Sequence, residues 1–72
     1  MYRTMRNGTV ALDFEACERK ARGMTRDALM WSARDAREAA EANPGARKAG
    51  AWTDEMHTYL SEVARRDRAE GA

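Results

Sequence analysis

The chain has very few large apolar side chains from which to build a core. Its 72 residues include three Leu, two Val, one Phe and no Ile, against fifteen Ala. A domain of this size buries little surface, and a cross-link, a metal or a partner usually adds to its stability. We therefore expect a single small domain, residues 1–72, that is folded and mainly helical but only modestly stable alone.

The usual internal cross-links are not open to this sequence. Cys17 is the only cysteine, so one chain forms no disulfide. A structural zinc site takes four Cys or His ligands, and here Cys17 and the single histidine, His57, are the only ones. We expect no metal and no cofactor. Association with another molecule is the remaining source of added stability, and we predict a homodimer.

Charge and hydropathy argue against several functional classes of protein. Thirteen Lys and Arg residues almost balance twelve Asp and Glu residues, which gives a formal net charge of +1. This balance argues against an acidic nucleic-acid mimic and against a strongly basic nucleic-acid coat. No apolar run is long enough for a membrane span or a signal peptide. The sequence predicts a cytoplasmic protein without membrane contact, and the unpaired thiol agrees.

Residues 1–14 have the pattern of a β-hairpin. Asn7 and Gly8 both tolerate the positive φ angles of a two-residue type I′ turn. A turn centred there pairs Met5 with Val10 and Arg3 with Leu12. One face of the hairpin then carries Met1, Met5, Val10, Leu12 and Phe14. We expect that face to dock on helices, because an isolated hairpin is marginal in water.

A short helix is predicted over 14–22. Asp13 can cap its first turn, and Gly23 ends it. Cys17 lies on the apolar side of this helix. We therefore interpret its thiol as a buried structural group.

Two longer helices are predicted to form an antiparallel hairpin over 24–68. The first covers 26–42, after Thr25 as its cap. Its narrow stripe of small residues lets a second helix approach closely. Met30 and Trp31 fall beside that stripe. The stripe itself consists of Leu29, Ala33, Ala36 and Ala40.

The last helix is predicted over about 54–68, with Thr53 as its cap. A loop over 44–52, which begins with Pro-Gly, connects it to the preceding helix, and we expect 69–72 to form a frayed tail. Its apolar residues follow the i, i+3, i+4, i+7, i+8 spacing of a core-facing helix. They are Met56, Tyr59, Leu60, Val63 and Ala64.

The sequence contains no convincing catalytic or metal-binding pattern. Cys17 and His57 are the only nucleophile and base of interest, and they lie on separate predicted helices. Asp54 and His57 have the i, i+3 spacing of a ligand pair, but two ligands make a weak site. We predict that the chain is not an enzyme and that His57 is exposed on the flank of its helix.

Aromatic, Met and Arg residues are enriched in the cores of protein interfaces. In this chain they make up a large share of the bulky side chains. The candidate partner-binding residues are Met30, Trp31, Arg47, Lys48 and Trp52. For the two tryptophans, burial in the core is an equally good interpretation. Protein binding is the leading functional hypothesis.

A nucleic-acid-binding module is the alternative hypothesis. It would use Arg65, Arg66 and Arg68 near the end of the last helix to contact phosphates. Nearby acidic residues dilute this cluster, whereas a nucleic-acid footprint requires charge of one sign on one face.

The segment 49–66, AGAWTDEMHTYLSEVARR, resembles the closing segment of short phage and prophage proteins of unassigned function. The shared features are Lys-Ala-Gly before aromatic residues, then Asp-Glu, a His one position later, and a helix that ends in Arg-Arg. Ala51 stands where those proteins have a second aromatic residue. The likeness extends weakly back to Met24 and to 35–39, about two-thirds of the chain.

The resemblance implies a mode of action, because small phage proteins commonly bind and block a host machine. Anti-CRISPR proteins are one such group. The resemblance thus implies a phage or prophage inhibitor of a host protein complex, with an anti-CRISPR as one form.

Overall fold

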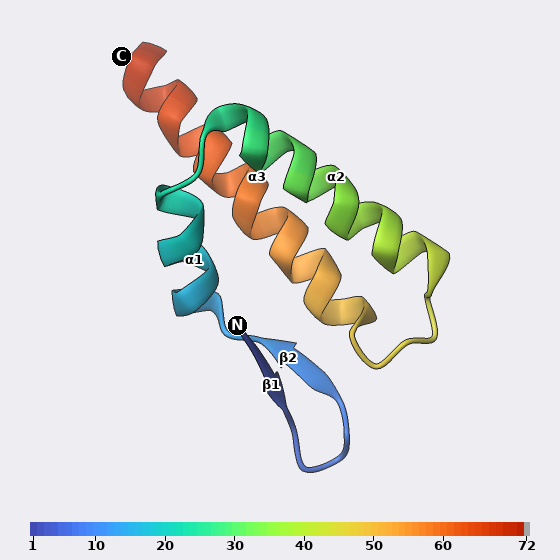
Figure 1. Ribbon diagram of the computed structural model, residues 1–72. Helices are drawn as coiled ribbons and strands as arrows, with labels where there is room; N and C mark the ends of the chain where they lie inside the picture. The colour runs from blue at the N-terminus through green and yellow to red at the C-terminus, as the bar shows by residue number, and fades with distance from the viewer. Residues whose placement is uncertain (72) are drawn as a thin grey trace.

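A two-stranded antiparallel hairpin opens the chain and three helices follow it, which confirms the mainly helical fold class (Figure 1). The computed structural model describes residues 1–71. The strands are β1 (Tyr2–Thr4) and β2 (Val10–Leu12), and the helices are α1 (Phe14–Arg22), α2 (Arg26–Ala42) and α3 (Ala49–Gly71).

The long helix α3 organises the fold. It lies between α1 and α2, and the hairpin sits at its N-terminal end (Figure 1). α2 and α3 form the expected antiparallel pair, and Leu29, Ala33 and Ala36 of the small-residue stripe are buried between elements. The core cluster consists of Leu12, Cys17, Ala21, Leu29, Ala33, Ala51, Tyr59 and Val63.

The starts of α1 and α2 are capped as the sequence predicts. The Ala16 amide donates to Asp13 Oδ1 at 3.2 Å, and the Ala28 amide donates to Thr25 Oγ1 at 3.1 Å. Each bond satisfies an amide that has no partner within its own helix. Cap and helix lie within a few residues of each other, so local sequence fixes both starts.

The start of α3 differs from the prediction. The helix begins at Ala49, and Thr53 lies inside it, where its hydroxyl donates to the Ala49 carbonyl at 3.2 Å. The Trp52 amide bonds to the Lys48 carbonyl at 2.9 Å, which closes the first turn. Ala51 is buried in the core, and this tertiary contact favours helix where the local sequence has no cap.

The end of α3 also differs from the expected frayed tail over 69–72. The helix continues through Gly71, and residue 72 lies outside the described part of the chain.

The hairpin turn contains three residues, not the two of the predicted type I′ turn. The Gly8 amide bonds to the Met5 carbonyl at 3.0 Å, and the Met5 amide to the Thr9 carbonyl at 2.7 Å. Within residues 1–71, Gly8 alone has a positive φ, 85°. Asn7 therefore does not adopt the left-handed conformation that a type I′ turn requires.

The longer turn shifts the register by one residue, and Tyr2 rather than Arg3 pairs with Leu12. A one-residue shift moves every side chain of one strand to the opposite face. Tyr2 accordingly packs against the core, whereas Met1 and Met5, which were expected on the docking face, are exposed. The predicted apolar face of the hairpin was wrong for β1.

No helix in residues 1–71 combines the length and apolar character that a membrane span requires.

Candidate functional site

A groove between α2 and α3 contains the main exposed apolar surface of the helices. Met30 and Trp31 line it from α2, and Met56 and Leu60 line it from α3. The exposed fractions are 46% for Met30, 64% for Trp31 and 39% for Leu60. Asp27, Ala33, Arg34 and Arg37 complete the lining of this α2–α3 groove.

The groove exists because the apolar faces of both helices are wider than their contact. Leu29 and Tyr59 are fully buried at that contact. The next residues, Met30 and Leu60, lie about 100° further round their helices and emerge at the surface. α1 and the hairpin pack against α3 (Figure 1), and no residue of either lines the groove.

The charged rim of the groove is loosely paired. Arg34 Nε lies 3.7 Å from Glu38 Oε1, and both side chains are more than half exposed. Exposed pairs of this kind contribute little to stability. Asp27 makes no ion pair within residues 1–71. The rim charges are therefore available to a partner.

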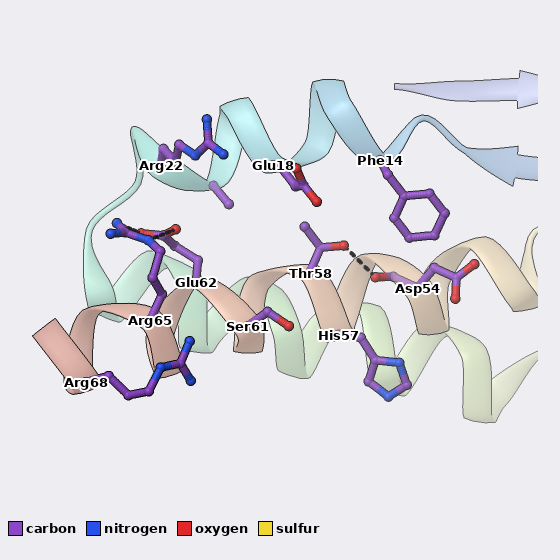
Figure 2. A pocket seen from close by; sticks show the side chains of 11 residues that line it. Phe14, Glu18, Arg22, Asp54, His57, Thr58, Ser61, Glu62, Arg65 and Arg68 are labelled. Atoms are coloured by element: carbon purple, nitrogen blue, oxygen red, sulfur yellow. Dashed lines mark hydrogen bonds and ion pairs between the residues drawn. The ribbon is translucent and has the colours of Figure 1, made fainter.

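A second groove lies between α1 and α3 (Figure 2). Phe14, which is half exposed, points from α1 toward α3 near Asp54, whereas His57 points away from α1. The Thr58 hydroxyl donates to the Asp54 backbone carbonyl at 2.9 Å. Residues 1–71 contain no group of three or more His, Cys, Asp or Glu side chains arranged to hold a metal ion.

Cys17 and His57 do not form a catalytic pair. His57 is exposed, as expected, whereas Cys17 is completely buried within the core. Burial raises the pKa of the Cys17 thiol, and the nearby Glu55 carboxylate raises it further. A thiol with a raised pKa and no access to solvent is a poor nucleophile.

The C-terminal arginine cluster is largely engaged within the protein. Arg65 and Arg66 both bind Glu62, with their shortest contacts to its Oε2 at 2.6 and 2.7 Å. The hydrogen bonds from Arg65 and then Arg66 lower the pKa of Glu62 to about 2. Arg68 is exposed and makes no ion pair within the described residues. Arg65 and Arg66 are therefore not free to act as a basic surface.

Arg66 also joins α3 to the turn between α1 and α2. Its Nη2 donates to the carbonyl oxygens of Ala21, Arg22 and Met24 at 3.2, 3.2 and 2.7 Å. The carbonyls at a helix end have no partner within the helix, so this guanidinium caps the end of α1.

Two of the remaining candidate residues, Arg47 and Lys48, lie where the loop before α3 meets the hairpin. Lys48 Nζ is 4.7 Å from the ring centre of Tyr2, a cation–π contact. The Arg47 carbonyl accepts a bond from the Val10 amide at 3.3 Å. Trp52 is half-buried in the first turn of α3. None of these three candidates lines the α2–α3 groove.

Of the predicted partner-binding residues, the structure thus places some in the groove and others outside it, and it adds further residues to the groove. Met30 and Trp31 belong to the groove, together with Leu60 and Met56, which the sequence placed on the core face of α3. The sequence could have indicated the charges beside Met30 and Trp31, because four α2 residues at i, i+3, i+4, i+7 spacing share one helix face. They are Asp27, Met30, Trp31 and Arg34.

No protein-family model matches the chain, and no curated protein and no solved structure matches it at a significant level. The resemblance to short phage and prophage proteins stays a prediction.

Proposed function

We propose that this chain is a non-enzymatic interaction protein whose α2–α3 groove binds an apolar stretch of a protein partner. One observation carries the proposal. In a chain with three Leu, two Val and one Phe, the side chains of Met30, Trp31 and Leu60 are exposed together at one groove. Contiguous exposed apolar surface marks interaction sites, and Trp is the residue type most enriched among their hot spots.

Inhibition of a host protein complex, including an anti-CRISPR activity, rests on the sequence resemblance alone. Binding through a groove inhibits the partner only when it covers a surface that the partner needs for its own activity. The alternative of a nucleic-acid-binding module has weaker support, because Arg65 and Arg66 are bound to Glu62. Arg68 is the member of that cluster that makes no ion pair within residues 1–71.

Site-specific photo-cross-linking in the producing cells tests the docking function. A benzoylphenylalanine at position 30 should form adducts with protein, whereas the same residue at position 15 should not. Glu15 is a matched control because its side chain is 89% exposed on α1, away from the groove. Trp31→Ser should reduce the adducts at position 30 and leave the helical circular dichroism unchanged. Equal yields at both positions, or no adduct at position 30, would contradict the proposal.

A further inference from the structure

The outer face of α2 carries a charge pattern that is complementary to itself. Asp27, Met30, Trp31 and Arg34 share one face because they are spaced at i, i+3, i+4 and i+7. In chain order the face reads acidic, apolar, apolar, basic. A second copy running in the opposite direction presents basic, apolar, apolar, acidic.

From this pattern we infer that the partner at the α2–α3 groove is a second copy of the same chain. The two α2 helices pack antiparallel about a two-fold axis between Met30 and Trp31. Met30 then faces the partner's Trp31, and Asp27 faces the partner's Arg34. This inference rests on the proposed docking function of the groove and names its occupant.

The two-fold arrangement doubles each of these contacts. An interface of this symmetry uses the same patch on both chains, so one Asp–Arg pairing gives two ion pairs. One Met–Trp pairing likewise gives two contacts between a thioether and an aromatic ring, a favourable combination. The apolar pair lies at the centre of the patch and the charges at its edges, as in typical protein interfaces.

The charges that this arrangement uses are the ones that the fold leaves uncommitted. Asp27 makes no ion pair within residues 1–71, and Arg34 has only the exposed 3.7 Å contact to Glu38. By contrast, Arg26 is paired with Asp67. Forming the interface therefore breaks no strong ion pair of the single chain.

The face is also open to a second helix. α1 and the hairpin contact α3, and α2 lies at the other edge of the molecule (Figure 1). Antiparallel pairing about this axis overlaps residues 26–35 of the two chains, a length of about 15 Å at the rise of an α-helix. The partner's Trp31 then lies over the groove and shields Leu60, which is 39% exposed in the single chain.

Charge exchange between two variants tests the inference. In sedimentation velocity over a concentration series, the wild-type chain should associate to a dimer. Asp27→Arg and Arg34→Asp should each weaken self-association about tenfold or more, because each change creates two like-charge contacts. An equimolar mixture of the two variants should restore the dimer, since one chain then carries two positive charges and the other two negative ones.

Glu41→Arg is the matched control. It reverses an exposed acidic residue of the same helix that lies beyond the 26–35 overlap and outside the groove, and it should leave the dimer intact. The inference fails if the wild-type chain stays monomeric at millimolar concentration. It also fails if the mixture associates no better than the single variants, or if Glu41→Arg weakens the dimer equally.

The same measurements separate this inference from the proposed function. A monomeric chain whose position 30 still cross-links to a different protein keeps the docking function and loses the second copy as partner. A monomeric chain with no adduct at position 30 loses both.

Discussion

Glu62 and Arg66 lie one turn apart on α3, and Arg66 Nε donates to Glu62 Oε2 at 2.7 Å. The same guanidinium donates to the carbonyl of Met24, 42 residues away in the chain, also at 2.7 Å. A carboxylate that is only 7% exposed thus orients an arginine that holds the end of α1 and the next turn against α3. The contact adds to the burial of Cys17 and Ala21 in holding α1 against α3.

Arg66→Met should destabilise the protein by about 2 kcal/mol, because the Arg22 and Met24 carbonyls lose this donor and Glu62 loses one of its two arginines. The Ala21 carbonyl keeps its bond from the Met24 amide. Urea denaturation followed by circular dichroism measures this change. Arg68→Met is the control and should stay within about 0.5 kcal/mol of the wild type, since Arg68 is exposed. Equal effects of the two variants would contradict the role of Arg66.

Glu62→Gln should alter the acid side of the stability curve. The folded state holds the pKa of Glu62 at about 2, below the ordinary value of 4.5. Its contribution is therefore complete above about pH 4.5 and is lost as the pH falls toward 2. The variant should be less stable than the wild type at pH 7, and the difference should shrink between pH 5 and 2. Urea midpoints across this range provide the measurement, and parallel curves would refute the expectation.

Tyr59→Phe should flatten the alkaline side of the curve. The Tyr59 hydroxyl is fully buried and donates to Glu55 Oε2 at 2.6 Å. Burial and then this carboxylate raise the pKa of Tyr59 above its ordinary value of 10.0. Stability should be complete below pH 10 and fall above it, by about 1.4 kcal/mol per pH unit for this group.

The phenylalanine variant should lose the part of the slope that Tyr59 contributes, whereas the part due to Tyr2, whose pKa burial and Glu55 also raise, should remain. It should lose about 1–2 kcal/mol at neutral pH, because the hydrogen bonds to Glu55 and from Lys20 are absent. Both chains are best compared in a Cys17→Ala background, because burial also raises the pKa of the Cys17 thiol. Identical alkaline slopes would show that Tyr59 does not titrate as expected.

Gly8→Ala and Gly50→Ala should have opposite effects. Gly8 has φ 85°, a backbone conformation that L side chains rarely adopt, so alanine should cost about 1 kcal/mol. Gly50 lies in the first turn of α3 with open space around it, and alanine should stabilise the helix by about 0.5 kcal/mol. Thermal denaturation measures the change in stability of each variant. A stabilising effect of Gly8→Ala would contradict the observed turn.

Leu29→Ala and Trp31→Ser separate core from surface on α2. Leu29 is completely buried, and its truncation should cost about 3 kcal/mol. Trp31 is 64% exposed, and its replacement should change the unfolding free energy of the monomer by less than about 0.5 kcal/mol. Urea denaturation at concentrations too low for association gives both values. A large loss on Trp31→Ser would place that indole in the core.

The extents of α1 and α2 could be predicted because their signals are local. A cap, an apolar stripe and a terminating Gly or Asn-Pro lie within one element, as at Asp13 and Thr25. The start of α3 was not predicted, because Thr53 has the residue type of a cap but the tertiary contacts of Ala51 extend the helix before it. Propensity is a weak guide where packing competes with it.

The candidate site could be predicted only in part. Its α2 residues, Met30 and Trp31, stand out because they fall beside the stripe. Leu60 shares the helical period of the core residues Tyr59 and Val63, and periodicity alone does not tell how much of an apolar face a neighbouring helix will cover. Engagement of Arg66 by Met24 depends on a contact across 42 residues, which no local pattern indicates.

The sequence by itself determined the element types and their order, the two capped helix starts, and the close antiparallel packing that small residues at helical spacing permit. The tertiary structure alone decided the register of the hairpin, the first turn of α3, the pairing of Glu62 with two arginines, and which apolar residues stay exposed at the groove. The physical reason is range: caps and periodicity act within a few residues, whereas register, burial and ion pairing depend on groups that only the folded chain brings together.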